Sequence, residues 1–300
     1  MSTFLTLTIA GISLAALYFM VSAGLSLIFG LMGVLNFAHG AFFLWGAYVW
    51  YQVFSQTGNF WVALLAALAA GAAIGGIVEV IFIRPIYQRP LSQILVTLGL
   101  ALVLTQLVIA VWGVNAEYPA DIPGLSRTLY LGSFYVPSYD FFIIGSGLVV
   151  LILVWSLLRF TRIGLIVRAG VENPTMVSAL GINVRLVFLG VFSLGSALAA
   201  LGGAIYTPYV HQATPDMGQS ILLSAIIVVV LGGLGSYLGS ALGALIIGLA
   251  QNYVPYYTAQ IHGLETVSAS AASLISLVIL VVILLLRPQG LMGIKLEGGL

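Results

Sequence analysis

The sequence has no cysteine and few charged residues. Without cysteine, neither a disulfide framework nor a thiolate metal site can form. Aspartate, glutamate, lysine and arginine make up 6% of the 300 residues, whereas ordinary soluble domains contain about 25%. Nine basic and eight acidic residues cannot cover the surface of a soluble fold of this length. Lipid is therefore the expected solvent for most of the chain, and the net charge of +1 indicates no nucleic-acid partner.

Other absences narrow the function further. The three histidines, His39, His211 and His262, lie far apart and offer no metal-ligand spacing. No cluster of acids or nucleophiles marks a catalytic centre, and no glycine-rich phosphate loop with a lysine is present, so the chain is predicted to hydrolyse no nucleotide and to bind no cofactor. The apolar stretches hold no acids spaced like a proton relay. This counts against a proton-coupled carrier, although sodium coupling through backbone carbonyls stays open.

Apolar residues make up 61% of the sequence, and the mean hydropathy is +1.18. A bilayer core about 30 Å thick needs about 20 apolar residues in a helix. The predicted fold is all-α: one transmembrane bundle of eight or nine spans over residues 1–300, with interrupted helices. The first charged residue is Glu79, so the N-terminus is interpreted as the first span and not as a cleaved signal. The candidate spans are 7–29, 36–54, 61–83, 92–113, 139–158, 185–206, 220–238, 240–256 and 267–286.

The distribution of basic residues predicts the orientation, because cytoplasmic loops carry an excess of lysine and arginine. Eight of the nine lie in three places: Arg84 and Arg89; Arg159, Arg162, Arg168 and Arg185; Arg287 and Lys295. The loops between carry Glu117, Asp121, Asp140, Asp216 and Glu265, with Arg127. The C-terminus is predicted to be cytoplasmic. The side of the N-terminus depends on whether residues 30–40 form a turn or a re-entrant segment, which the sequence leaves open.

Two glycine-rich segments interrupt apolar stretches. The first, 30–40, contains Gly33, Asn36, His39 and Gly40, and the asparagine and histidine are its strongly polar side chains. Backbone that leaves helical geometry in a membrane must line a cavity or be buried in protein, and broken helices commonly present their backbone to a transported solute. A plain turn, with Asn36 capping the next helix, explains the segment equally well.

The second interruption is Gly232, Gly233, Leu234, Gly235 and Ser236, where a charge-free stretch too long for one helix must turn back. Elsewhere, small residues recur every fourth position, which brings membrane helices into close contact. The series are Gly71 and Gly75; Gly195, Ala199 and Gly203; Gly235, Gly239 and Gly243. These series predict tight packing. Glu79 is expected to pair with Arg84.

The segment 159–185 is the most informative polar loop. Asn173 before Pro174 is a typical helix start, with Glu172 placed where negative charge favours a helix N-terminus, and Gly181 is a typical helix stop. A short helix of about two turns is therefore predicted between them. It either lies among lipid headgroups or docks onto a cytoplasmic partner, and the residues alone favour neither.

The chain also resembles a known family. The residues that carry the resemblance are Leu27 to Gly40, Arg84–Pro85, Val96–Thr97–Leu98–Gly99, Arg162–Ile163–Gly164, Arg168–Ala169, Asn173–Pro174, Gly181–Ile182–Asn183 and Val230 to Ser236. In this order they are similar to the LivH-type permeases of branched-chain amino acid ABC importers, over nearly the whole chain. One position differs: many members carry glutamate after the His-Gly pair, and this chain has Ala41.

The resemblance implies a multi-pass bacterial inner-membrane subunit that works with partners. These are two ABC ATPase subunits, which bind ATP-Mg, a second LivM-like permease and a periplasmic substrate-binding protein. It implies that the 173–183 helix couples the permease to an ATPase, through Arg168, Glu172, Asn173, Pro174, Ala179 and Gly181. It also adds Thr97 to the pathway formed by Gly33, Asn36, His39, Gly40, Gly232, Gly233, Gly235 and Ser236.

The expected function is translocation of branched-chain amino acids or similar small polar solutes. A urea- or amide-specific permease of the same family is the alternative. A secondary carrier or a solute channel, each without cytoplasmic partners, is the competing class. The carrier and the channel both predict that the 159–185 loop can be altered without loss of transport.

Overall fold

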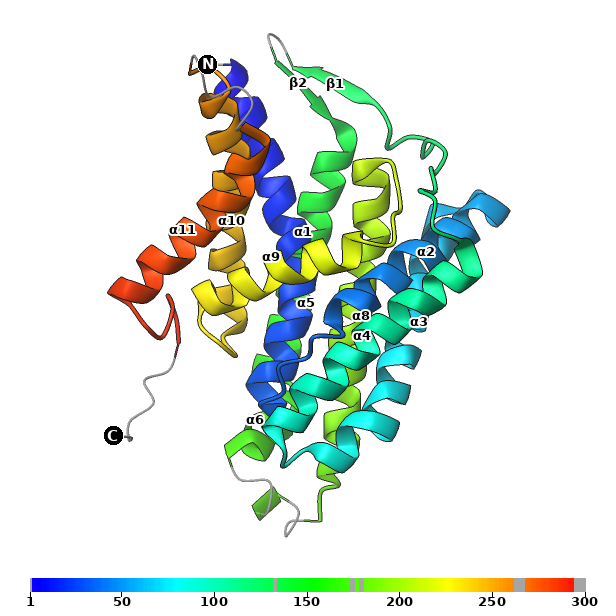
Figure 1. Cartoon of the computed structure of the whole chain (residues 1–300), viewed down its shortest axis with the longest axis vertical. Helices are drawn as coiled ribbons and strands as arrows, with labels where there is room; N and C mark the ends of the chain where they lie inside the picture. The colour runs from blue at the N-terminus through cyan, green and yellow to red at the C-terminus, as the bar shows by residue number, and fades with distance from the viewer. Residues whose placement is uncertain (1, 132–133, 173–175, 178–180, 262–267, 294–300) are drawn as a thin grey trace.

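A computed structural model describes residues 2–131, 134–172, 176–177, 181–261 and 268–293 as a bundle of long helices (Figure 1). The predicted all-α membrane bundle is confirmed: six helices are long and apolar enough to cross a membrane, and α9 and α11 add shorter apolar helices. The helices are α1 (Ser2–Met32), α2 (His39–Thr57), α3 (Phe60–Val78), α4 (Pro90–Trp112), α5 (Ser138–Phe160), α6 (Arg162–Glu172), α8 (Val184–Val210), α9 (Met217–Gly232), α10 (Tyr237–Thr258) and α11 (Ser268–Leu286).

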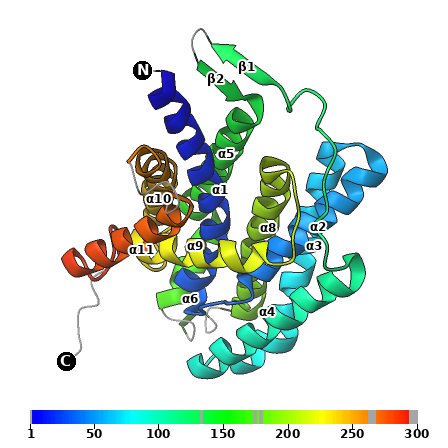
Figure 2. The same ribbon diagram turned by 45° about the horizontal axis from the view of Figure 1, so that its top comes forward.

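Two helices, α1 and α8, form the centre of the bundle. α1 packs against α5, α8, α9 and α10, and α8 packs against α1, α2 and α3. α4 lies at the edge against α2, and α11 lies at the opposite edge against α10 and α9. Figure 2 shows α9 crossing the bundle between α8 and α10, at a steep angle to α1. The centre is apolar and holds large buried side chains such as Phe42, Tyr48 and Phe192.

Close backbone contacts follow the small-residue series predicted from the sequence. A Cβ atom at Gly75 would lie 2.2 Å from the Ser196 hydroxyl oxygen, and one at Gly203 would lie 2.0 Å from the Phe43 carbonyl oxygen. Gly239 meets Gly232 in the same way, with 2.2 Å to its carbonyl oxygen. The series therefore place helix backbones in direct contact, as small residues do where lipid supplies little drive for association.

The charged residues separate to the two ends of the bundle. The turn between α3 and α4 carries Arg84 and Arg89 at the end where α6 lies, and we call this the arginine end (Figure 1). The opposite, acidic end holds the N-terminus and the 113–137 loop: the Thr6 hydroxyl donates to the Tyr135 carbonyl at 3.5 Å. The sequence left the side of the N-terminus open. In the structure, the N-terminus lies at the end of the bundle opposite the arginine end.

Two elements were not predicted. α6 occupies residues 162–172, which the sequence analysis treated as loop, and its helical form comes from a side of apolar residues that packs against α5, α1 and α8. A two-stranded antiparallel hairpin, β1 (Thr128–Leu131) with β2 (Phe134–Pro137), stands at the acidic end and pairs Thr128 with Pro137. The sequence analysis gave no strands, so the hairpin is a small correction to the all-α prediction.

The helix of α3 changes pitch where it reaches the arginine end. Residues Glu79–Ile83 form one turn of π-helix, followed by a short 3₁₀ segment, Arg84–Ile86. In a π turn the backbone bonds run from residue i to i+5, so residues five apart lie on one side. This geometry places Glu79 beside Arg84, and their Oε2 and Nη2 atoms are 2.8 Å apart. The predicted ion pair is confirmed.

Candidate functional site

The first interruption runs from an exposed Gly33 to the buried start of α2. α1 ends at Met32, Gly33 adopts a left-handed φ of 64°, and the chain returns without helical structure until α2 begins at His39. The Nε2 atom of His39 lies 2.9 Å from the carbonyl oxygen of Val21. Val21 precedes the end of α1 by three turns, about 16 Å at the usual rise of 1.5 Å per residue. The start of α2 therefore lies beside the middle of α1.

The two polar side chains of this segment are buried and only partly satisfied. The Asn36 Oδ1 atom accepts the Ala38 N–H at 3.0 Å, one residue before α2 begins. Asn36 therefore supports the turn into the helix, close to the predicted cap. Within the described part of the chain, the Asn36 Nδ2 and His39 Nδ1 atoms have no hydrogen-bond partner. A buried polar atom without a partner is costly, which makes this pair the strongest candidate for contact with a solute or a bound water.

Glycines close the segment on two sides. A Cβ atom at Gly40 would lie 2.2 Å from the carbonyl oxygen of Gly218 in α9. One at Gly24 would lie 2.3 Å from the carbonyl oxygen of Gly195 in α8 and 3.0 Å from the His39 ring. The break is thus enclosed by the backbones of α1, α8 and α9, which is one of the two settings in which irregular backbone is tolerated in a membrane.

The second interruption meets the first. Gly233 and Gly235 have left-handed φ values of 105° and 79°, and the chain turns there from α9 into α10. Gly235 lies against Gly30 of α1, and the Ser236 hydroxyl accepts the Gly239 N–H at 3.1 Å as the cap of α10. The C-terminal segment also packs here, since the Met292 N–H donates to the Gly232 carbonyl at 2.9 Å. The two glycine-rich segments therefore form one contact region.

Thr97 lies on α4, at the edge of the bundle. Its buried hydroxyl donates to the Gln93 carbonyl of its own helix at 2.8 Å. α4 packs against α2 and the η1 and η2 segments (Glu79–Ile83 and Arg84–Ile86). The described contacts thus tie Thr97 to its own helix, and its place in the pathway stays a prediction.

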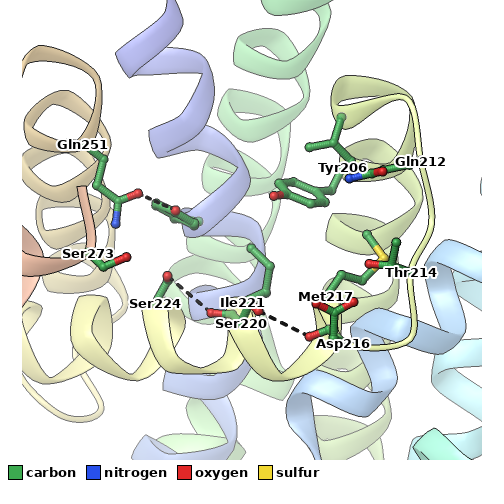
Figure 3. Close-up of a pocket in the computed structure, with 12 residues that line it drawn as sticks. Tyr206, Gln212, Thr214, Asp216, Met217, Ser220, Ile221, Ser224, Gln251 and Ser273 are labelled. Carbon is green, nitrogen blue, oxygen red and sulfur yellow. Dashed lines mark hydrogen bonds between the residues drawn. The ribbon is translucent and has the colours of Figure 1, made fainter. Parts of the chain in front are cut away.

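A polar cavity of about 320 Å³ opens among α1, α8, α9, α10 and α11 (Figure 3). Hydroxyl and amide groups dominate its wall, and among the described residues its lining has a single carboxylate and no basic side chain. The lining residues are Tyr18, Tyr206, Val210, Gln212, Thr214, Asp216, Met217, Ser220, Ile221, Ser224, Gln251 and Ser273. Its rim includes the 211–216 loop, so the cavity faces the acidic end.

Hydrogen bonds order one wall of this cavity. The Tyr18 hydroxyl donates to Gln251 Oε1 at 2.6 Å, and Gln251 Nε2 donates to the Ser276 hydroxyl at 2.8 Å. On the floor, formed by α9, the hydroxyls of Ser220 and Ser224 donate back to carbonyls one turn earlier, at 3.4 and 3.5 Å (Figure 3). These groups can exchange their partners for a polar solute without leaving a charge unpaired.

The sequence analysis did not identify these residues, because five helices far apart in the chain contribute them. One local signal was available. Asp216, at the N-cap of α9, and Ser220 and Ser224 within it are spaced four apart and therefore lie on one side of a mostly apolar helix. A polar stripe of this kind on a membrane helix indicates a polar cavity or a helix contact.

Three of the predicted coupling residues are among the described ones, in and after α6 near the arginine end. Arg168 and Glu172 belong to α6, whereas Asn173, Pro174 and Ala179 fall outside the described residues. Gly181 is described, with a left-handed φ of 81°, and the Ile182 N–H donates to the Val177 carbonyl at 3.3 Å. A bond across five residues beside a left-handed glycine is the pattern that ends many helices. The backbone at Gly181 thus has the geometry that a helix stop requires, while the predicted helix, which falls largely outside the described residues, and its coupling role remain predictions.

Also at the arginine end, Glu79 belongs to a small polar cluster with Arg84 and Tyr87. Its side chain is completely buried, pairs with Arg84 and accepts a hydrogen bond from the Tyr87 hydroxyl. Burial, and then the Glu79 carboxylate, raise the pKa of the Tyr87 phenol above its ordinary value, so Tyr87 donates as a neutral hydroxyl. The cluster fixes the turn between α3 and α4 and holds no metal-ligand group among the described residues.

Comparisons with known proteins agree on one family. Residues 7–285 match the family described as branched-chain amino acid transport system, permease component. A probable branched-chain amino acid transport permease protein LivH of Methanocaldococcus jannaschii is 29% identical over 92% of this chain and 88% of its own length. The high-affinity LivH permease of Escherichia coli K12 is 25% identical over 94% of this chain and 93% of its own.

A ribose import permease protein, RbsC of Escherichia coli K12, is 32% identical, over 65% of this chain and 61% of its own length. No solved structure matches the chain significantly. The branched-chain amino acid permeases named above cover more of this chain than the ribose permease does.

Proposed function

The chain belongs to the family of branched-chain amino acid transport permeases, and from this premise we propose that it is the translocating subunit of an ABC importer. The observation that carries the proposal is the match over residues 7–285, which includes both glycine-rich interruptions and the loop between α5 and α8. The proposed location is the bacterial inner membrane, with the arginine end and the C-terminus cytoplasmic. The N-terminus then lies outside.

The proposed pathway begins in the polar cavity at the acidic end. A zwitterionic amino acid suits it, because the Asp216 carboxylate attracts an ammonium group, and hydroxyl and amide donors are available for a carboxylate. Gly40, the residue after the buried His39, lies against Gly218 of α9, and other residues of α9 form the floor of that cavity. Motion at the contact between the two glycine-rich interruptions would carry the solute past them toward the arginine end.

In this proposal, partner subunits supply the energy for transport. Two ABC ATPase subunits bind and hydrolyse ATP-Mg, a second, LivM-like permease completes the pathway, and a periplasmic binding protein delivers the substrate. The coupling contact is proposed for residues 159–185, with Arg168, Glu172, Asn173, Pro174, Ala179 and Gly181. Support comes from the place of α6 at the arginine end (Figure 1) and from the left-handed backbone of Gly181.

Urea or a short amide is the second candidate substrate. The described lining of the cavity holds one carboxylate and no basic side chain, so a neutral solute that exchanges hydrogen bonds with hydroxyls and amides also fits. Uptake of radiolabelled leucine and of urea by the assembled complex in liposomes separates the two candidates.

The proposed function is tested by extracting the tagged chain in mild detergent and identifying co-purifying proteins by mass spectrometry. An ABC ATPase in stoichiometric amount, together with a second permease, is the expected result. A chain that purifies alone and transports solute in ATP-free liposomes would instead be a carrier or a channel, and the coupling assignment would be wrong.

A further inference from the structure

Three arginines surround a hollow of about 480 Å³ at the arginine end, which we call the arginine hollow. Its lining residues are Arg84, Pro85, Tyr87, Gln88, Arg89 and Arg185. Two of the arginines come from the turn between α3 and α4, and the third from the first turn of α8. The ring of Tyr87 packs edge-on against Phe188, with 5.4 Å between centroids. Because Phe188 lies three residues after Arg185, on the same face of α8, this contact holds Arg185 over the turn.

The charge of the arginine hollow is only partly neutralised by the protein. Arg84 is paired with the buried Glu79. Among the described residues, neither Arg89 nor Arg185 has an acidic partner, and both side chains are exposed. Three guanidinium groups against one carboxylate leave two positive charges facing the hollow. Guanidinium groups bind phosphate oxygens in paired hydrogen bonds, so this arrangement suits a phosphate group.

The surface next to the arginine hollow is apolar. Leu91 and Leu95, one turn apart on α4, are 79% and 71% exposed, and Leu186, next to Arg185 on α8, is 62% exposed. On the other side, Ile81 and Phe82 are also exposed. All of these belong to helices apolar enough to cross a membrane. The hollow therefore lies where the ends of three such helices meet, at the level where a bilayer changes from headgroups to hydrocarbon.

We propose that the arginine hollow binds the headgroup of an anionic phospholipid, whose acyl chains lie along Leu91 and Leu95. Free phosphate offers the same oxygen atoms to the arginines, but it would leave the exposed Leu91 and Leu95 without an apolar contact. An acidic protein surface could pair with the same arginines. It would, however, leave the neighbouring Leu91 and Leu95 without an apolar partner. A phospholipid satisfies both surfaces at once.

The test uses the full chain in its purified complex, titrated with dioleoyl phosphatidylglycerol and followed by native mass spectrometry. One phosphatidylglycerol should bind in clear preference to phosphatidylcholine. The double variant Arg89→Gln/Arg185→Gln should weaken this binding at least about tenfold, as expected for the loss of two charge-assisted contacts. The matched control, Arg159→Gln/Arg162→Gln, removes the same charge from the same end outside the hollow, and should bind as the wild type does.

Four results would overturn the proposal. Equal weakening in both double variants would mean that general positive charge attracts the lipid. Equal binding of phosphatidylcholine would mean that the phosphate site is not selective for anionic lipid. Displacement by inorganic phosphate at equal affinity would mean that the hollow is a free phosphate site. Loss of a co-purifying partner protein from Arg89→Gln/Arg185→Gln, with lipid binding unchanged, would mean that the hollow is a protein contact.

Discussion

Gly30 in α1 and Gly235 in the turn between α9 and α10 lie backbone to backbone: a Cβ atom at position 30 would lie 2.9 Å from the Cα atom of Gly235. The contact joins the two glycine-rich interruptions, which are separated by most of the sequence. Any relative movement of the two interruptions must therefore change this contact.

Gly30→Ala should disturb this contact. The added methyl group meets backbone atoms that cannot rotate away, and such overpacking costs about 1–3 kcal/mol. We expect a lower unfolding temperature in detergent and reduced uptake by the complex. Gly145→Ala is the control, because a Cβ atom there meets no atom within 4 Å. Equal behaviour of the two variants would show that the contact is loose.

Asn36→Leu should reduce uptake severalfold while the complex still assembles. The substitution removes the Oδ1 acceptor for the Ala38 N–H and the buried Nδ2 donor. Losing a turn of this kind costs about 1 kcal/mol, which is too little to prevent folding. The measurement is uptake normalised to the amount of complex recovered. Asn36→Ser keeps a hydrogen-bond acceptor for the turn but lacks the Nδ2 donor. If uptake is normal in Asn36→Ser and reduced in Asn36→Leu, the loss in Asn36→Leu comes from the turn and not from the missing donor. Wild-type uptake in Asn36→Leu would limit Asn36 to a structural role.

Ser224→Leu should fill part of the polar cavity. The leucine replaces a hydroxyl that faces the solute in the proposed pathway, so uptake should fall severalfold while ATP hydrolysis continues. Leu223→Phe adds bulk at the neighbouring position of α9, whose side chain is 59% exposed and does not line the cavity. Uptake at wild-type rates in both variants would place the pathway elsewhere.

Gly181→Val should uncouple transport from ATP hydrolysis. A β-branched residue at a φ of 81° is strained, and the left-handed conformation costs about 1–2 kcal/mol for ordinary residues. The helix stop should fail, and with it the proposed docking of residues 173–183. Asparagine tolerates this conformation, so Gly181→Asn should retain most of the activity. The readout is uptake together with substrate-stimulated ATPase activity. Normal uptake in Gly181→Asp, or after deletion of 173–183, would contradict the coupling role.

Much of the fold could be predicted from the sequence, because long apolar stretches and glycine interruptions are local signals. Each predicted span contains a helix, but 220–238 runs past the end of α9 at Gly232 into the following turn, and six helices are long and apolar enough to cross a membrane. The turns at Gly33 and Gly233 lie where the glycines indicated. α6 was missed because its 11 residues mix arginines and glycines, and its helical form depends on packing against α5 and α8. The polar cavity was missed because Tyr18 and Gln251 meet only in the folded chain.

The depth at which α2 begins also has a consequence for how the chain is built into the membrane. α2 is not among the helices apolar enough to cross a bilayer by composition, and its first residues find their neighbours in α8 and α9, far later in the chain. A translocon that releases helices in order would therefore hold α2 without a complete binding surface until α9 emerges. We therefore expect α2 to complete its packing only after α9 has been inserted, and truncation before α9 should leave α2 accessible to proteases.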